Sequence, residues 1–154
     1  MALSKLDNLY RQVILDHSAH PHHHGSLQES TNKVEMNNPT CGDVITLDVE
    51  IEDNKIKNIA FGGSGCSIST ASASMMTDAV LGQSVDTAKT LAHAFSEMVQ
   101  GHEIDEEDAL GDAAMLSGVA KFPARIKCAT LGWKALEQAI DSDGTATTHH
   151  YHKE

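Results

Sequence analysis

A chain of 154 residues fits a single domain, and its 40% hydrophobic content is too high for a disordered chain, although 4% aromatic residues indicate a core of small side chains. Its net charge of -11 repels phosphate backbones, so we expect no nucleic-acid partner. Neither a bilayer-spanning apolar run nor the apolar segment of a signal peptide is present, so we expect no membrane association and a cytoplasmic location.

The N-terminal elements expected are one helix, one loop and one short strand. A helix is predicted over residues 3–16, where apolar side chains recur at helical spacing: Leu3, Leu6, Tyr10, Val13 and Ile14. Residues 17–30 lose this periodicity, so we predict an exposed loop. We expect no native role for the five histidines of this loop: His17, His20, His22, His23 and His24. Val34 and Met36 alternate with polar residues and predict a strand.

A β-hairpin is predicted next along the chain. Its first strand shows alternation of apolar and polar side chains, with Ile45, Leu47, Val49 and Ile51 on one face. The polar residues 52–55 predict the turn. In the second strand, Ile56 falls on the opposite parity from Ile59 and Phe61, so we expect a bulge or burial on both faces there.

The remainder of the chain is predicted to be helical. Apolar rows indicate helices over residues 68–82, 84–101 and 126–140, whereas the acidic residues 102–112 predict a solvated excursion between helices. Strands followed by helices predict an α+β fold with a small three-stranded antiparallel sheet and helices packed on one face. We expect one domain over residues 1–140 and a polar, disordered tail over residues 141–154.

Three cysteines are an odd number, and a reducing compartment disfavours disulfides, so Cys41, Cys66 and Cys128 are interpreted as thiols for metal binding or for chemistry. Cys41 lies on the loop that enters the hairpin, where Gly42 lets the backbone turn so that Cys41 and Asp43 face one point. Cys66 follows a glycine-rich turn and begins a helix, whose unpaired N-terminal N–H groups favour a thiolate.

Cys128 is placed in the last helix, next to Lys127 and one turn after Arg125, so positive charge surrounds this thiol as well. Three thiolates and the carboxylate of Asp43 make four donors, which suits tetrahedral Zn²⁺, while thiolates also suit iron–sulfur clusters. The alternative for free cysteines is burial as small hydrophobic side chains. Two of the three cysteines lie at glycine-flanked element boundaries rather than in apolar rows, which favours a shared site.

Three motifs occur in chain order: Asn38-Pro39-Thr40-Cys41-Gly42-Asp43, Gly62-Gly63-Ser64-Gly65-Cys66-Ser67-Ile68-Ser69 and Arg125-Ile126-Lys127-Cys128. Together they resemble the iron–sulfur cluster assembly scaffold superfamily of NifU and IscU, and within it the SufU branch. The resemblance covers nearly the whole chain up to about Ile140. It implies a three-stranded antiparallel sheet with helices on one side, which agrees with the fold expected from the alternation and periodicity.

The resemblance also implies a ligand set and a partner. By motif, the ligands of Zn²⁺ are Cys41, Asp43, Cys66 and Cys128. The implied sulfur donor is a pyridoxal-phosphate cysteine desulfurase of the SufS type. IscU-type scaffolds carry a histidine immediately before the third cysteine, and this chain has Lys127 there. The acidic residues 102–112 resemble the insertion that distinguishes SufU, so both departures favour sulfur transfer over cluster building.

The function expected from the resemblance is zinc-dependent sulfur transfer. Cys41 is expected to be the catalytic nucleophile, which leaves the metal, attacks the terminal sulfur of the desulfurase persulfide and passes the sulfur to a downstream cluster assembly complex. Arg125 is interpreted either as a solvated helix residue or as a residue that binds the desulfurase.

Two alternatives belong to other functional classes. An IscU-like scaffold would assemble a transient iron–sulfur cluster on the same cysteines instead of holding zinc. A cysteine hydrolase would need a histidine directed at the nucleophile, but His93 and His102, the histidines of the helical half, adjoin no cysteine motif.

Overall fold

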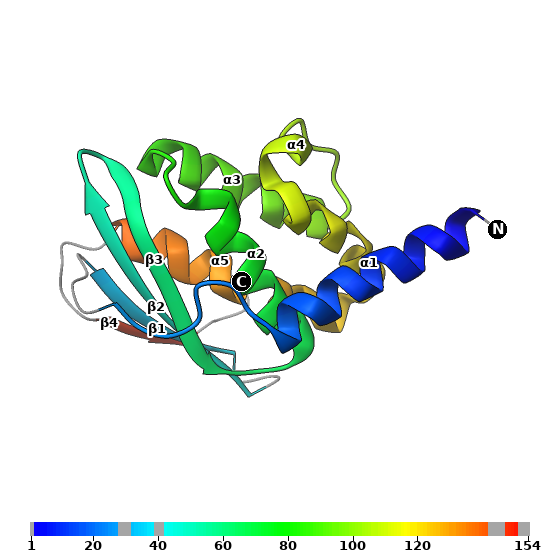
Figure 1. Cartoon of the computed structure of the whole chain (residues 1–154), viewed down its shortest axis with the longest axis horizontal. Helices are drawn as coiled ribbons and strands as arrows, with labels where there is room; N and C mark the ends of the chain where they lie inside the picture. The colour runs from blue at the N-terminus through cyan, green and yellow to red at the C-terminus, as the bar shows by residue number, and fades with distance from the viewer. Residues whose placement is uncertain (1, 28–31, 39–41, 142–146, 151–154) are drawn as a thin grey trace.

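The computed structural model describes residues 2–27, 32–38, 42–141 and 147–150, arranged as a sheet covered by helices (Figure 1). The helices are α1 Ala2–Ala19, α2 Ser67–Val80, α3 Val85–Val99, α4 Glu107–Leu110, the 3-10 helix η1 Gly111–Lys121 and α5 Pro123–Asp141. The strands are β1 Asn32–Asn38, β2 Asp43–Glu52, β3 Lys55–Ser64 and β4 Thr147–His150. Among these described helices, none combines the length and the apolar character that crossing a lipid bilayer requires.

The sheet has the strand order β3-β2-β1-β4, and its first three strands form the predicted antiparallel sheet. The hairpin of β2 and β3 carries a register shift between Glu50 and Ile51, opposite the start of β3. The expected bulge is therefore confirmed. It lets Ile56, which is fully buried, face the core together with Ile59 and Phe61 despite its opposite parity.

A fourth strand, β4, was not predicted from the sequence. Residues 147–150 pair in parallel with β1, although the segment 141–154 was expected to be a polar, disordered tail. The correction applies to these four residues, whose backbone pairs with the edge of β1 that would otherwise present unpaired N–H and C=O groups. Polar composition gave no signal for this pairing, because a parallel edge strand depends on a neighbour rather than on its own pattern.

The helices α5 and α2 cover one face of the sheet, as predicted, with α5 against β1 and β2 and with α2 against β3 (Figure 1). Three helices begin close to where the sequence places them, and Ser84 caps α3 by accepting a hydrogen bond from the N–H of Thr87. The side-chain amide of Asn32 in β1 donates a hydrogen bond to the carbonyl of Ala139, which connects β1 to the end of α5. The fold is thus the expected α+β arrangement.

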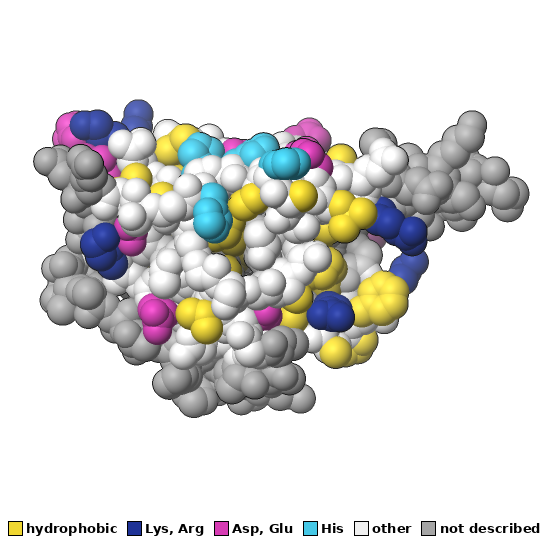
Figure 2. Space-filling model, turned by 60° about the horizontal axis from the view of Figure 1, so that its bottom comes forward, with side chains coloured by type: hydrophobic (Ala, Val, Ile, Leu, Met, Phe, Trp, Pro, Cys, Tyr) yellow, Lys and Arg dark blue, Asp and Glu magenta, His cyan; other side chains and the backbone are white. Residues whose placement is uncertain are grey.

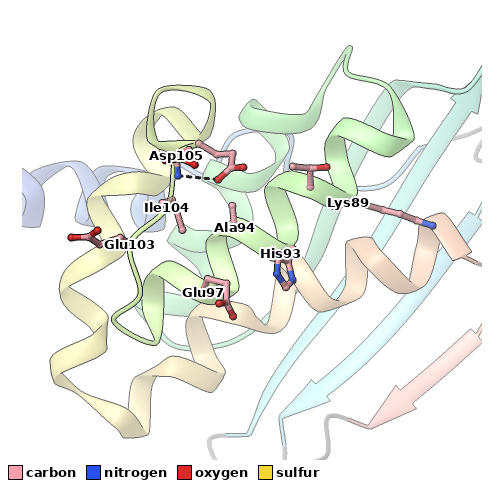
Figure 3. A pocket seen from close by; sticks show the side chains of 9 residues that line it. Lys89, His93, Ala94, Glu97, Glu103, Ile104 and Asp105 are labelled. Atoms are coloured by element: carbon pink, nitrogen blue, oxygen red, sulfur yellow. Dashed lines mark hydrogen bonds between the residues drawn. The ribbon is translucent and has the colours of Figure 1, made fainter.

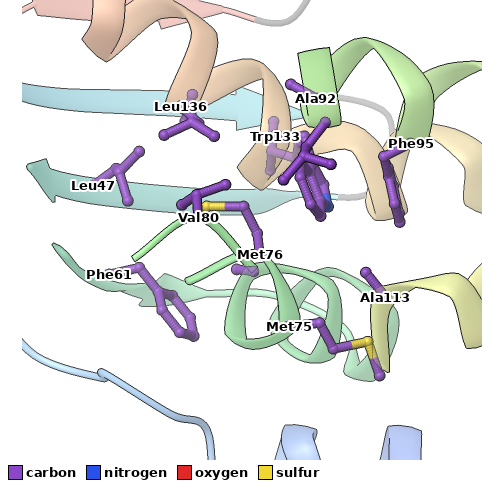
Figure 4. Close-up of a cluster of buried hydrophobic side chains, with 14 of the residues drawn as sticks. Leu47, Phe61, Met75, Met76, Val80, Ala92, Phe95, Ala113, Trp133 and Leu136 are labelled. Atoms are coloured by element: carbon purple, nitrogen blue, oxygen red, sulfur yellow. The ribbon is translucent and has the colours of Figure 1, made fainter. Parts of the chain in front are cut away.

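The core lies between the sheet and these helices (Figure 4). Its centre is a stacked pair of rings, Phe95 of α3 and Trp133 of α5, with centroids 4.6 Å apart. Met75 and Met76 of α2 are both buried, which confirms the interpretation of Met75 as a core residue. The core therefore joins α2, α3 and α5 into one layer, and it contains many alanines beside the larger side chains, as the low aromatic content predicts.

The contact between α2 and α5 is close because small residues line it. A side-chain carbon added to Gly132 would lie 3.1 Å from the Cβ of Ala73, so glycine permits this approach. Ser72 completes the contact with two hydrogen bonds: its hydroxyl donates to the carbonyl of Ala129 at 2.5 Å and accepts from the indole N–H of Trp133 at 3.1 Å. These bonds leave no polar group of Ser72 unpaired in the core.

The acidic residues 102–112 are more ordered than a solvated excursion. Most of their carboxylates are exposed, as expected, but Leu110 at the end of α4 is buried and Ile104 packs against the core. These two apolar side chains hold the segment against α3 and η1. The sequence did not predict this packing, because two apolar residues among many acidic ones show no helical periodicity.

Phe95→Ala is expected to lower the free energy of unfolding by about 3–5 kcal/mol, because it removes a buried ring and leaves a cavity beside Trp133. The matched control is Phe122→Ala, whose ring is 63% exposed and whose loss should change that free energy by less than about 0.5 kcal/mol. Chemical denaturation of both variants measures the difference, and equal losses would contradict this account of the core.

Candidate metal centre

Three of the four predicted ligands lie together at one end of the helical layer. Asp43 is the first residue of β2, Cys66 is the N-cap residue of α2, and Cys128 lies in the N-terminal part of α5. One carboxylate oxygen and the two sulfur atoms lie within 4.8 Å of one another. Cys41, the fourth predicted ligand, lies outside the described residues.

The spacing of these three donor atoms is compatible with a shared cation. Zinc binds sulfur at about 2.3 Å and carboxylate oxygen at about 2.0–2.2 Å, so two of its tetrahedral ligands lie roughly 3.5–4 Å apart. The observed limit of 4.8 Å thus requires only small side-chain movements to reach a common ion. A sulfur-rich set with one oxygen also fits the preference of zinc for Cys ligands.

Asp43 has an unusual environment for a carboxylate. It is 1% exposed, and its Oδ1 accepts a hydrogen bond from the backbone N–H of Cys66 at 2.9 Å. Its Oδ2 is also buried and, within the described part of the chain, has no hydrogen-bond partner. A buried carboxylate oxygen without a partner is costly, and a bound cation would satisfy it.

The first turn of α2 supplies part of the compensation for this buried charge. The N–H group of Cys66 that binds Asp43 lies at the N-terminus of the helix, where the helix dipole stabilises negative charge. The carboxylate of Asp43 and the thiol of Cys66 therefore share one helix terminus, and two anions there would repel each other unless a cation neutralises them.

Glycine at position 65 makes the approach of Asp43 to α2 possible. A side-chain carbon on Gly65 would lie 2.8 Å from Oδ1 of Asp43 and 2.3 Å from the hydroxyl of Ser69. Gly63 has φ of +105°, and a side-chain carbon there would meet the carbonyl of Val44 at 2.1 Å. The glycine-rich turn thus serves the close packing of β3, β2 and the start of α2.

Cys66 and Cys128 differ in their access to solvent. Cys128 is fully buried, and its sulfur accepts a hydrogen bond from the side-chain amide of Asn38 at 4.0 Å. Cys66 is only partly buried. Of the two thiols, that of Cys66 is therefore the more accessible to a reacting molecule.

The surface next to this end of α5 combines charge with an exposed ring. Lys121, Phe122 and Arg125 are all exposed at the start of the helix. Figure 2 shows basic side chains in dark blue beside apolar side chains in yellow on one side of the face it displays. Arg125 is thus at the surface, and its predicted contact with a desulfurase stays a prediction.

The histidines needed for a cysteine hydrolase do not lie at this cluster in the described part of the chain. His93 lines a separate surface hollow between α3 and residues 103–106, together with Glu97 and Lys89 (Figure 3). His102 bonds to the carboxylate of Glu97 at 3.0 Å. Among the described residues, the positions of the histidines therefore do not support the interpretation of this chain as a cysteine hydrolase.

A second group of candidate ligands was missed by the sequence analysis. His17 and His22, for which no native role was expected, lie with Asp78 so that one donor atom from each falls within 4.8 Å of the others. His22 and Asp78 are 56 residues apart, and no local spacing connects them. Several histidines are exposed on the face shown in Figure 2. In the sequence, the abundance of histidine was the only sign of such a group.

Comparison with known proteins identifies the family. The model of the NifU-like N-terminal domain matches residues 9–129. An iron–sulfur cluster assembly scaffold protein IscU of Streptococcus pyogenes serotype M1 is 58% identical, with 95% of this chain and 91% of the relative covered. The zinc-dependent sulfurtransferase SufU of Bacillus subtilis is 53% identical, with 89% and 92% covered.

Solved structures agree with this assignment. A crystal structure of a hypothetical protein is 57% identical and superposes with a TM-score of 0.84 over 88% of this chain and 99% of the other. A SufU from Fervidobacterium islandicum AW-1, described as a candidate scaffold for the SUF system, is 33% identical with a TM-score of 0.80, covering 84% and 95%. Because the domain match, the relatives and the fold coincide with the cysteine and aspartate motifs, this chain belongs to the NifU-like family of iron–sulfur cluster assembly proteins.

Proposed function

We propose that this chain is a zinc-dependent sulfurtransferase of iron–sulfur cluster assembly, which accepts persulfide sulfur from a SufS-type cysteine desulfurase. The observation that carries the proposal is the cluster of Asp43, Cys66 and Cys128, with one carboxylate oxygen lacking a partner among the described residues. The 53% identity to a protein named zinc-dependent sulfurtransferase supports the same activity.

The residues present fit a zinc ion. Asp43, Cys66 and Cys128 would hold it from three different elements, and Cys41, two residues before Asp43, would be the fourth ligand. When bound, zinc supplies a redox-inert positive charge that keeps the thiols deprotonated and the loops together. Oδ2 of Asp43, which has no hydrogen-bond partner among the described residues, supports a cation ligated by this donor set.

The chemistry of transfer rests on Cys41. Its thiolate attacks the terminal sulfur of the desulfurase persulfide, so that a new sulfur–sulfur bond forms on Cys41 while the bond to the desulfurase breaks and its cysteine leaves as a thiolate. No net oxidation or reduction occurs, because one persulfide is exchanged for another. Cys66, Cys128 and the hydrogen-bonded Asp43 would remain as the other three ligands during the exchange.

The partner surface that we propose lies beside the cluster. Lys121, Phe122 and Arg125 are exposed there and offer positive charge and an apolar ring to the desulfurase, with Arg125 as a contact residue. The sulfur would pass on to a downstream cluster assembly complex. Because the thiols must stay reduced for this exchange, we place the protein in the cytoplasm.

The second candidate function is that of a scaffold on which an iron–sulfur cluster assembles. It is favoured by the 58% identity to a protein named as such a scaffold, and thiolates are the usual ligands of these clusters. Against it stands Lys127 immediately before Cys128, where a histidine would add a ligand. A protonated lysine offers donors only and cannot bind a cation.

Substitution of the ligands should remove the thiolate-bound metal. In protein reconstituted with cobalt(II), each of Asp43→Asn, Cys66→Ser and Cys128→Ser is expected to weaken or abolish the sulfur-to-metal charge-transfer absorption, since each removes one donor of the set. Asp53→Asn, in the exposed turn of the hairpin, is the matched control and should leave the spectrum unchanged. Untagged protein that instead retains iron and sulfide, with visible absorption, supports the scaffold.

Cys41→Ala should abolish sulfur acceptance. With a SufS-type desulfurase and cysteine, the wild type is expected to gain persulfide on Cys41 and to stimulate the desulfurase, and the variant should do neither. Mass spectrometry under non-reducing conditions locates the sulfur. Normal acceptance by the variant would refute the assigned role, whereas Phe122→Ala separates loss of docking from loss of chemistry because it leaves Cys41 in place.

Gly65→Ala is expected to weaken zinc binding roughly tenfold or more, a cost of about 1.4 kcal/mol or above, because the added methyl group displaces Asp43 or Ser69. Gly118→Ala is the matched control, since nothing lies within 4 Å of a side-chain carbon at that position. Competition with a chromophoric chelator measures both affinities. Equal affinities in the two variants would mean that the close approach of Asp43 to α2 does not serve the metal.

A further inference from the structure

A second set of metal-binding side chains lies where α1, the histidine loop of residues 20–25 and α2 meet. One ring nitrogen from each of His17 and His22 and one carboxylate oxygen of Asp78 lie within 4.8 Å of one another. The two imidazole rings have centroids 4.4 Å apart and are tilted by 45°. This set shares no residue with the thiol cluster at the other end of α2.

His17 is held rigidly at this place. It is 2% exposed, its Nδ1 lies 2.7 Å from the hydroxyl of Ser74, and its Nε2 lies 3.0 Å from Oδ2 of Asp112. A metal-bound histidine commonly has its other ring nitrogen hydrogen-bonded, which fixes the tautomer and the ring orientation. Both ring nitrogens of His17 thus have a polar neighbour, Ser74 at Nδ1 and Asp112 at Nε2, so an ion bound by His17 would replace one of these two contacts.

The same hydroxyl of Ser74 also positions His22. The backbone N–H of His22 donates to it at 2.7 Å, so one buried serine organises both histidines. Nδ1 of His22 lies 2.5 Å from Oδ2 of Asp78, and Nδ1 of His23 lies 3.5 Å from Oδ1 of the same carboxylate. Asp78 therefore has imidazole nitrogens on both oxygens.

The loop itself is tied to the sheet, so the arrangement does not depend on a free segment. The N–H of Gly25 donates to the carbonyl of Phe61 at 2.8 Å, and the N–H of Phe61 donates to the carbonyl of His23 at 3.0 Å. His22 and Asp78 remain about half exposed, with side-chain exposures of 44% and 40%. Solvent ions thus have a path to a site whose inner ligand, His17, is buried.

We propose that this cluster binds a divalent transition-metal ion, with zinc as the expected one, through His17, His22 and Asp78. Imidazole nitrogens and carboxylate oxygens are ligands that zinc accepts at about 2.0–2.2 Å. The ion would connect the end of α1 to the histidine loop and to α2. This site is independent of the proposed sulfur transfer, because it uses none of the residues assigned to that activity.

The test counts metal ions per full-length chain by calorimetry with zinc and by absorption with cobalt(II). The wild type is expected to bind two ions, of which one shows thiolate charge transfer and the other does not. The double variant His22→Ala/Asp78→Asn should lose the ion without charge transfer and keep the other. Ser74→Ala should weaken the same ion by roughly 10–100-fold, because it removes the hydrogen bonds that orient both histidines.

Two controls separate this site from unspecific capture by other histidines. His20→Ala removes an exposed imidazole from the same loop, and the triple variant His149→Ala/His150→Ala/His152→Ala removes those near the C-terminus. Both are expected to keep two ions. In the wild type, the imidazole NMR signals of His17 and His22 should shift on zinc addition, whereas that of His93 should not.

Three results would overturn the proposal. The first is saturation of the wild type at a single ion that shows thiolate charge transfer, and the second is retention of the ion without charge transfer in His22→Ala/Asp78→Asn. The third is loss of that ion in either control variant. Loss of the thiolate-bound ion in Cys66→Ser or Cys128→Ser bears only on the sulfur-transfer proposal, so the two proposals fail separately.

Discussion

The close contact between α2 and α5 is the interaction on which the rest of the structure depends. Gly132 against Ala73 lets the two helix backbones approach, and the two hydrogen bonds of Ser72 fix their alignment. This alignment places the N-cap of α2 next to the N-terminal part of α5, and so brings Cys66 to Cys128. Any looser packing would separate the two sulfur atoms, because each is carried by a rigid helix rather than by a loop.

The sheet contributes the third donor, the carboxylate of Asp43, whose burial has an electrostatic cost. Asp43 begins β2 and is buried against the start of α2, with one oxygen bonded to the helix and the other without a partner among the described residues. A carboxylate and two thiols in so small a volume repel one another when ionised, unless a cation lies between them. In the proposed zinc site, the cation would neutralise the charges that close packing brings together, so metal binding would stabilise the fold at this place.

Helix α2 organises two donor sets of different chemistry. Its N-cap carries the sulfur-rich set, while Ser74 and Asp78 near its C-terminal end organise a set of nitrogen and oxygen donors. Soft thiolates bind zinc tightly and also suit iron–sulfur clusters, whereas imidazole and carboxylate suit zinc and other divalent ions. Relatives with names as different as scaffold and sulfurtransferase are consistent with the first set.

The sequence by itself determined the elements whose signals are local: the hairpin, its bulge at the parity change of Ile56, the helix that begins near Ser84 and the motifs that mark the thiol ligands. The tertiary structure alone decided the pairing of β4 with β1, the burial of Leu110, the burial of the Asp43 carboxylate and the meeting of His22 with Asp78. The physical reason is that periodicity reports how one segment is solvated, whereas these four features depend on which distant segment packs against it.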